Sequence, residues 1–257
     1  MIEFNKVSLC FGERVVLREI DVRIALHERV AIVGGSGSGK TSLLKLLLGL
    51  NRPDSGNIVI DGEEITRLSE KALAPIRMKF NIVFQEGALF DSLSVRENTA
   101  FCLREKFKMS EAEIERKVRD VLRRLGLEEA IDLMPEQLSG GMQRRVAIAR
   151  SLSECEPRMF LYDEPTAGLD PITAEQIGDL IADLSSGHAP KNKGFIIVTH
   201  QVLDVARLAR RLIFLHEGTI RFDGELAELR HTPDPLLRTF FKEVLSGNAP
   251  LEKSDHV

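Results

Sequence analysis

The 257-residue sequence has few cysteines, no long apolar run and no excess of basic charge. Its three cysteines are far apart and form no C-x-x-C pair, which favours reduced thiols in a cytosolic protein over a disulfide framework. No apolar run approaches the roughly 18 residues of a membrane span, and the first residues lack the apolar core of a secretion signal. The formal net charge of -4 gives no reason to expect nucleic-acid binding. These absences favour one cytosolic globular domain, or one domain carrying a subdomain.

Short apolar runs alternate with helical patterns along most of the chain. Strands are predicted at 3–9, 15–24, 29–33, 57–62, 79–84, 159–163, 195–199, 212–216 and 219–224. Helices are predicted at 39–49, at 94–124 and from 139 onward, and again after Asp170 and after His200. The alternation predicts an α/β protein with a mainly parallel central sheet covered on both faces. The first two strands, joined by a turn, predict an antiparallel β subdomain at the N-terminus.

A helical block at about 87–150 interrupts this alternation. Ser110 and Glu113 form a capping box before one of its helices. We therefore predict that 87–150 is an inserted helical subdomain. The core would then comprise 1–86 and 151–230, and residues 231–257 would form a C-terminal helix and a flexible tail.

The segment GGSGSGKTS, residues 34–42, follows a predicted strand and precedes a predicted helix. It fits the pattern G-x-x-x-x-G-K-[ST] of a phosphate-binding loop. Glycines let successive backbone N–H groups point at phosphate oxygens, and the helix behind them adds the positive end of its dipole. Lys40 can reach the β- and γ-phosphates, and the Thr41 hydroxyl can bind magnesium. The predicted nucleotide-binding residues are Gly34, Gly35, Ser36, Gly37, Ser38, Gly39, Lys40, Thr41 and Ser42.

Two carboxylates stand where the strand predicted at 159–163 ends. Asp163 is its last residue and Glu164 follows. A strand-end Asp can hold magnesium beside a phosphate loop. A carboxylate beside that metal, here Glu164, can polarise the attacking water as a general base. The alternative is an acidic loop after a buried strand, but the phosphate loop favours nucleotide hydrolysis.

The segment LSGGMQ, residues 138–143, places Ser139 and two glycines at a predicted helix start, which makes a second site suited to an anion. One nucleotide needs one phosphate loop, so a second favours a nucleotide shared with another molecule. An ordinary N-cap serine beside a Gly-Gly turn is the alternative. With these motifs the sequence resembles ABC-type ATPases, which are P-loop NTPases that bind ATP and Mg²⁺. In that family this signature closes over the nucleotide of the opposite subunit, which implies such contacts from Ser139, Gly140, Gly141, Met142 and Gln143.

The resemblance also implies roles for residues outside these motifs. Gln85 matches the glutamine that contacts magnesium and water, with a solvated glutamine as the alternative. His200 matches the switch histidine at the γ-phosphate, so the implied catalytic residues are Glu164, His200 and Gln85. Phe11 matches the aromatic residue that stacks on adenine, and core burial is the alternative. Asp170 matches the loop that joins the two active sites, and it is also a good helix cap.

The resemblance implies three protein ligands for the metal, which are Thr41, Gln85 and Asp163. Two positions depart from the family pattern. Tyr162 replaces the usual aliphatic residue before the strand-end Asp, and Met142 replaces a frequent glutamine of the signature. These differences could tune the rate of hydrolysis, but they leave the class unchanged.

Four longer phrases resemble the ATPase subunits of Mla-type phospholipid transporters of Gram-negative bacteria and their plastid relatives. They occupy 84–101, 133–145, 163–174 and 232–241. The resemblance implies a homodimer bound to a membrane permease at the cytoplasmic face of the inner membrane. Further implied partners are a small accessory subunit and a lipid-binding substrate protein, with no nucleic acid. The alternative is the ATPase of an amino-acid or methionine importer. A soluble ABC ATPase of translation or DNA repair is a remote alternative, because duplicate motifs and long coiled-coil arms are missing.

Two apolar segments predict contacts with partners. Leu89 and Phe90 follow Gln85 where the core meets the helical block, and the resemblance implies that Phe90 lies largely exposed in a groove that takes a permease helix. In the tail, apolar residues recur on one helical face. They are Leu236, Leu237, Phe240, Phe241, Val244 and Leu245. This face either caps its own domain or partly reaches the second ATPase or an accessory subunit.

Overall fold

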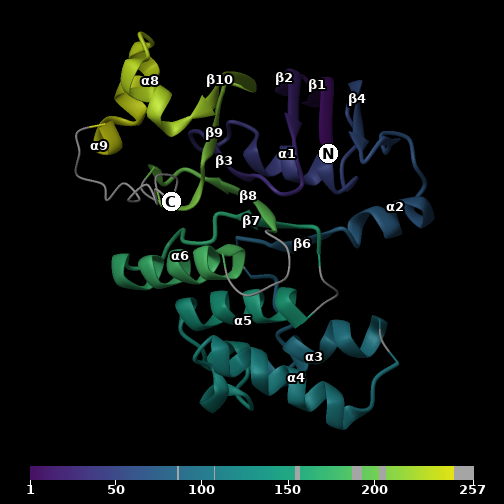
Figure 1. The fold of residues 1–257 in the computed structure, drawn as a ribbon. Coiled ribbons are helices and arrows are strands. Elements are labelled where there is room, and N and C mark those ends of the chain that lie inside the picture. Colours follow the sequence, from purple (N-terminus) through teal and green to yellow (C-terminus); the bar gives the residue numbers. More distant parts are fainter. Residues whose placement is uncertain (86, 107, 154–156, 187–192, 203–206, 246–257) are drawn as a thin grey trace, which may run out of the picture.

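The computed structural model describes residues 1–85, 87–106, 108–153, 157–186, 193–202 and 207–245 (Figure 1). Within these residues, six strands form the central sheet in the order β10-β9-β3-β8-β7-β6. All neighbours are parallel except β10, which pairs antiparallel with β9 at one edge. The strands are β3 (Arg29–Val33), β6 (Phe80–Val83), β7 (Met159–Asp163), β8 (Gly194–Thr199), β9 (Arg211–His216) and β10 (Thr219–Glu225). The predicted, mainly parallel sheet is confirmed.

A second sheet is antiparallel, with the strand order β2-β1-β4-β5. Its strands are β1 (Ile2–Phe11), β2 (Arg14–Ile24), β4 (Ser55–Ile60) and β5 (Glu63–Glu64). The turn between β1 and β2 contains Gly12, whose φ of 60° is easily adopted by glycine. Buried residues alternate along the first half of β1, because one face of this sheet packs on the apolar core. The predicted N-terminal antiparallel subdomain is confirmed.

Both faces of the central sheet are buried. Along β3, Val30 and Ile32 join the apolar cluster that contains the leucines of α1 (Lys40–Leu47) and the antiparallel sheet. Ala31 and Val33 join the opposite cluster, which contains residues of α5 (Gly140–Ser153) and α6 (Pro171–Ser186). Figure 1 shows the same layers, with α1 on one side of the sheet and α5 and α6 on the other. Burial on both faces explains why these strands are continuous apolar runs.

The helical block packs against the α5 side of the central sheet. Within the described ranges, the remaining helices up to the tail are α2 (Glu70–Arg77), α3 (Val95–Lys106), α4 (Glu111–Arg124), η1 (Glu128–Ala130), η2 (Pro135–Gln137) and η3 (Leu226–His231). At the start of α4, the Ser110 hydroxyl accepts a hydrogen bond from the Glu113 N–H, and Glu113 Oε2 accepts one from the Ser110 N–H, so the predicted capping box is confirmed. Helices α3, α4 and α5 share one apolar cluster with the sheet. The boundaries 87–150 of an inserted subdomain therefore remain a proposal.

The C-terminal segment forms two short helices, α8 (Pro235–Phe240) and α9 (Lys242–Leu245), in place of one continuous helix. Phe241 is fully buried, and the rings of Phe240 and Phe241 lie 4.8 and 5.7 Å from the ring of Phe214 in β9. Leu237 and Val244 are also buried. The apolar face of this segment therefore caps its own domain. The predicted flexible end, 246–257, and part of the helix predicted after His200 lie outside the described residues.

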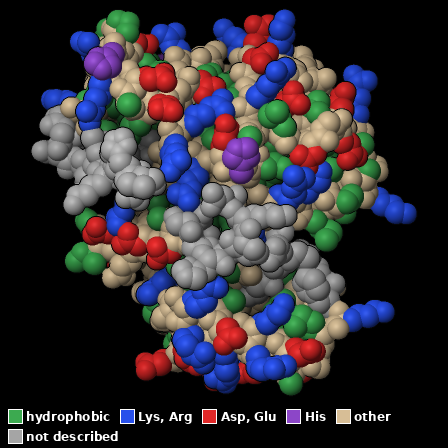
Figure 2. All heavy atoms as spheres, viewed as in Figure 1, with side chains coloured by type: hydrophobic (Ala, Val, Ile, Leu, Met, Phe, Trp, Pro, Cys, Tyr) green, Lys and Arg blue, Asp and Glu red, His purple; other side chains and the backbone are tan. Residues whose placement is uncertain are grey.

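Basic and acidic side chains are interspersed over the face of the molecule seen in Figure 2. At the surface, the Asp61 carboxylate meets the Lys79 ammonium at 3.0 Å, the Arg158 guanidinium at 2.6 Å and the amino terminus at 2.8 Å. Among the described residues, none of the helices has the length and apolar character needed to cross a membrane.

Candidate active site

The carboxyl ends of three neighbouring strands bring the predicted motifs together. In the parallel register, Val33 of β3 lies opposite Thr199 of β8, and Asp163 of β7 lies opposite Val198. The loop after β3 therefore begins beside the segments that follow β7 and β8. Ligands of open α/β sheets bind at this edge, outside the carboxyl ends of the strands.

The loop after β3 requires glycine at two positions for different reasons. A Cβ on Gly34 would lie 2.1 Å from the carbonyl oxygen of Leu215, so no larger residue fits there. Gly39, the residue before α1, has a φ of 104°, a conformation that L side chains rarely adopt. The Lys40 Nζ donates to the carbonyl oxygens of Gly34 and Gly35 at 2.9 and 3.1 Å. Lysine and loop thus form one closed local unit.

This loop forms one wall of a cavity of about 240 Å³. The cavity is lined by Phe11, Arg14, Val16, Gly37, Ser38, Gly39, Lys40, Thr41 and Ser42. Phe11 is 56% exposed, so its alternative interpretation as a core residue is wrong. Sequence reasoning missed Arg14 and Val16, which belong to β2. Their signal was the hairpin itself, because Arg14 pairs directly with Phe11 across the turn.

The structure brings together two predicted metal ligands, Thr41 and Asp163, and the predicted base Glu164 near Lys40. The Thr41 hydroxyl donates to Asp163 Oδ1 at 3.0 Å, although 122 residues separate them. Lys40 Nζ lies 3.5 Å from Glu164 Oε1, and His200 Nδ1 lies 2.8 Å from Glu164 Oε2. Glu164 therefore has a cation on one oxygen and an imidazole on the other.

Glu164 is held in an uncommon backbone conformation. Its φ is 48°, which is rare for a residue other than glycine, and its N–H donates to the Val198 carbonyl at 2.8 Å. The backbone N–H of His200 also donates to Glu164 Oε2, at 3.2 Å. Such strained positions cluster at functional sites. These bonds fix the carboxylate beside the phosphate loop.

Burial raises the pKa of the Asp163 carboxyl above its ordinary value. The hydrogen bond from Thr41 and the charge of Lys40 lower this pKa, whereas the nearby Glu164 charge raises it. The Thr41 hydroxyl and the Asp163 carboxylate place two oxygen atoms suited to bind a hard metal cation next to the phosphate loop. Among the described residues, no group of three His, Cys, Asp or Glu side chains could hold a metal alone. The donor set therefore fits a cation such as Mg²⁺, which takes one or two protein ligands plus nucleotide phosphates.

Gln85 lies two residues beyond Val83, which pairs with Tyr162 at the end of β6. Gln85 is exposed. It is therefore near the same sheet edge as Asp163, but its role toward the metal stays a prediction. Tyr162 is fully buried between Phe160 and Phe195, and burial raises the pKa of its hydroxyl. It packs in the core and does not enter the site.

The signature segment lies at the start of α5, and none of its residues lines the cavity at the phosphate loop of the described chain. Ser139 and Gly140 are exposed, and the Ser139 hydroxyl accepts a hydrogen bond from the Met142 N–H at 3.3 Å. The Gln143 amide donates to the Pro135 carbonyl at 2.8 Å. The predicted helix start is therefore present, its residues lie outside the cavity at the phosphate loop, and its role as a second anion site stays a prediction.

The signature packs against the loop that contains Asp170. A Cβ on Gly141 would lie 2.4 Å from Thr173 Cγ2, whereas a Cβ on Gly140 would meet only Leu169, at 3.6 Å. Asp170 Oδ1 accepts hydrogen bonds from the N–H groups of Ile172 and Thr173. The hydrogen bond with the Thr173 side chain, followed by those with the backbone N–H groups, lowers the pKa of the Asp170 carboxyl. Asp170 therefore caps α6, as the sequence predicts.

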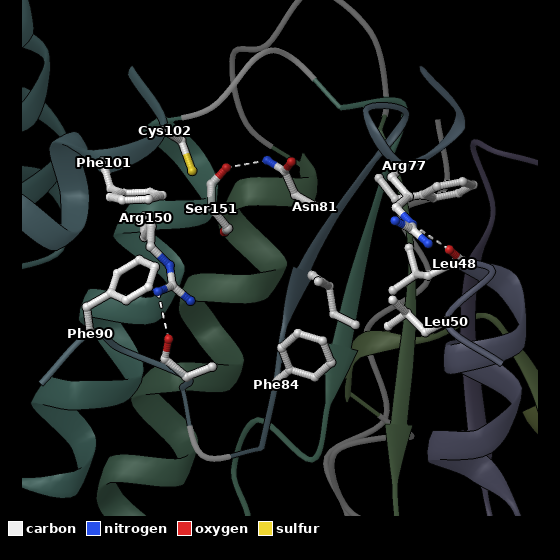
Figure 3. A pocket seen from close by; sticks show the side chains of 13 residues that line it. Leu48, Leu50, Arg77, Asn81, Phe84, Phe90, Phe101, Cys102, Arg150 and Ser151 are labelled. Atoms are coloured by element: carbon white, nitrogen blue, oxygen red, sulfur yellow. Dashed lines mark hydrogen bonds between the residues drawn. The ribbon is translucent and has the colours of Figure 1, made fainter. Parts of the chain in front are cut away.

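A groove of about 390 Å³ lies between the central sheet and the helical block (Figure 3). Phe90 lines this groove and is 41% exposed. The centre of its ring lies 4.5 Å from the centre of the Phe101 ring and 5.6 Å from the Arg150 guanidinium carbon. Arg150 also donates to the carbonyl oxygens of Gly87 and Ala88. The remaining lining residues are Leu48, Leu50, Arg77, Phe80, Asn81, Ile82, Phe84, Cys102 and Ser151. Leu89, by contrast, packs against the apolar core.

A phosphate loop between a buried parallel strand and a helix, with carboxylates at the end of another strand of the same sheet, defines a P-loop NTPase. The family model described as ABC transporter matches residues 17–167, and the chain belongs to this family. It is an ATP-binding and ATP-hydrolysing subunit of an ABC transporter.

Three curated relatives are similar over nearly the whole chain. Protein TRIGALACTOSYLDIACYLGLYCEROL 3, chloroplastic, of Arabidopsis thaliana is 40% identical over 96% of this chain and 75% of its own length. The intermembrane phospholipid transport system ATP-binding protein MlaF of Escherichia coli is 35% identical, over 97% of this chain and 91% of its own. The glutamine transport ATP-binding protein GlnQ of the same species is 38% identical, over 95% and 100%.

Solved structures of ATP-binding cassettes share the fold. The dimeric structure of the cassette MJ0796 in a post-hydrolysis state, bound to ADP and Pi, superposes with a TM-score of 0.79. It is 34% identical to this chain and covers 88% of it, and 99% of the cassette is matched.

Proposed function

We propose that this chain powers phospholipid transport between the membranes of a Gram-negative cell, as the ATPase subunit of an Mla-type transporter that maintains lipid asymmetry of the outer membrane. The observation that carries this proposal is the near full-length similarity to MlaF, at 35% identity over 97% of the chain. The similarity to the chloroplast relative, at 40%, supports it. An amino-acid importer is the second candidate, favoured by the 38% identity to the glutamine transport protein.

Within this function, the phosphate loop would bind the ATP phosphates, and Lys40 would neutralise part of their charge. Thr41 and Asp163, with Gln85, would hold a Mg²⁺ ion, which supplies positive charge to the phosphate oxygens. Phosphate oxygens compete with Glu164 for the Lys40 ammonium, which frees Glu164 to accept a proton from the attacking water. The hydrogen bond with His200 orients the other oxygen of Glu164.

Two copies of the chain would complete the two sites. The exposed Ser139 and Gly140 lie outside the cavity of their own phosphate loop, which suits a signature that acts on the nucleotide of a second copy. The dimeric state of the solved cassette supports a homodimer. The permease would bind in the groove beside Phe90, at the cytoplasmic face of the inner membrane. An accessory subunit and a lipid-binding substrate protein are further expected partners.

A mixed dimer tests whether the signature acts in trans. One subunit carries Lys40→Ala and the other Gly140→Asp, both in a Glu164→Gln background, and occluded ATP is measured. Gly140 is the better site than Gly141, because a side chain there does not collide with Thr173 of its own subunit. The new carboxylate would repel a bound phosphate. In trans, both lesions fall in one composite site, so about half of the ATP should stay occluded. Loss of all occlusion, as in each variant homodimer, would show action in cis.

Affinity purification of the full chain from the membranes of its host tests the transported substrate. Mass spectrometry is expected to identify a permease, a phospholipid-binding subunit and phospholipids. Recovery of an amino-acid-binding subunit would support the importer in its place, and recovery of ribosomes or DNA-repair proteins would contradict both.

Phe90→Asp tests the docking groove in the same purification. A carboxylate placed among apolar ring surfaces cannot be buried by a docked helix without a large desolvation cost, so the permease should be lost from the purified complex. Nucleotide binding and thermal unfolding should be unchanged, because Phe90 is 41% exposed. Met78→Asp is the matched control, since Met78 is 52% exposed and lies outside the groove lining. If Phe90→Asp retains the permease, this groove is not the docking site.

A further inference from the structure

Arg14 opens β2 directly after the hairpin turn and is paired across the hairpin with Phe11. Its side chain reaches toward the phosphate loop. The guanidinium Nη2 lies 3.4 Å from the position that a Cβ on Gly37 would occupy, and Arg14 lines the same cavity as Lys40 and Thr41. A residue of the antiparallel sheet thus contributes a charged side chain to the cavity at the loop.

Several arginines elsewhere in this molecule are held by carboxylates. Arg211 pairs with Asp223 and Glu28, and Arg77 pairs with Glu70. In the part of the chain that the structure describes, the Arg14 guanidinium has no hydrogen bond and no ion pair. Its donors beside the phosphate loop therefore remain available to a ligand.

Arg14 and Lys40 are the charged residues among those that line this cavity. Lys40 is buried, and its ammonium already meets two carbonyl oxygens and Glu164. The polyphosphate of ATP carries several negative charges, and a guanidinium matches phosphate oxygens with two parallel N–H donors. We propose that Arg14 binds the phosphate groups of the nucleotide as a second cationic contact, reaching the phosphate loop from β2.

The test compares ligands with and without a base. Dissociation constants of MgATP and of magnesium tripolyphosphate are measured by calorimetry for the full chain and for Arg14→Gln, which keeps most of the side-chain length and removes the charge. Loss of one charge-assisted contact is expected to weaken both ligands by a similar factor, about tenfold. Arg14→Lys should restore part of the affinity. The difference between Arg14→Gln and the parent should shrink as salt is raised, because the site is exposed.

Arg18→Gln is the matched control, because Arg18 is an exposed residue of the same strand and does not line the cavity. It should bind both ligands normally, and both glutamine variants should unfold at the parent temperature. Unchanged ATP affinity in Arg14→Gln would overturn the proposal. Weakened ATP binding with unchanged tripolyphosphate binding would also overturn it, because Arg14 would then contact the base or the ribose. A lower unfolding temperature without rescue by lysine would assign Arg14 a structural role in its place.

Discussion

Glu164→Gln is expected to slow ATP turnover about 10²–10⁴-fold while ATP binding is retained. The amide has nearly the shape of the carboxylate, but it cannot accept a proton from the attacking water. We expect this loss of turnover from a single substitution because Glu164 is buried beside Lys40 and is held by hydrogen bonds with His200 and the Val198 carbonyl. Steady-state ATPase activity of the complete transporter and equilibrium ATP binding measure the two quantities.

The variant should also accumulate as an ATP-bound dimer, which size-exclusion chromatography detects. Glu217→Gln is a close control, since Glu217 also follows a strand, has a φ of 46° and stands beside a histidine, His216, yet is exposed in the turn before β10. Its turnover should equal that of the parent. Near-normal turnover in Glu164→Gln would remove Glu164 from the role of general base.

Lys40→Ala should weaken ATP binding about 10–100-fold, since hydrogen bonds to charged groups contribute roughly 1.5–3 kcal/mol each. The Lys40 ammonium is positioned by the carbonyl oxygens of Gly34 and Gly35, so its removal deletes a fixed cation from the phosphate cradle. It also leaves the buried Glu164 without its 3.5 Å ion-pair partner. Calorimetric titration with MgATP measures the loss.

Lys45→Ala in the last turn of α1 is the control, because Lys45 is exposed and does not line the cavity. It should bind MgATP as the parent does. If Lys40→Ala retained full affinity with an intact fold, the loop at 34–42 would not be the site of the phosphates.

Local signals in the sequence predicted the parts of the fold that depend on neighbouring residues. The parallel strands were visible as apolar runs because both of their faces are buried, and the capping box needs only Ser110 and Glu113. Helix α2 was missed, because Pro75 lies inside it and interrupts the helical pattern. The spacing of apolar residues in the tail predicted an apolar face. It did not show whether this face packs on its own domain or reaches a partner. Periodicity shows which face is apolar, whereas the packing of Phe241 beside Phe214 shows what covers it.

The phosphate loop was predictable from its own residues, since most of its geometry arises within a short segment: glycines that free the backbone, and a lysine that bonds back to Gly34 six positions earlier. Which distant groups complete the site depends on how the whole chain folds. Thr41 meets Asp163 across 122 residues, Glu164 meets His200 across 36, and Arg14 comes to Gly37 from another sheet. These distances follow from strand order and register, which are set by the packing of the whole core and are written in no single segment.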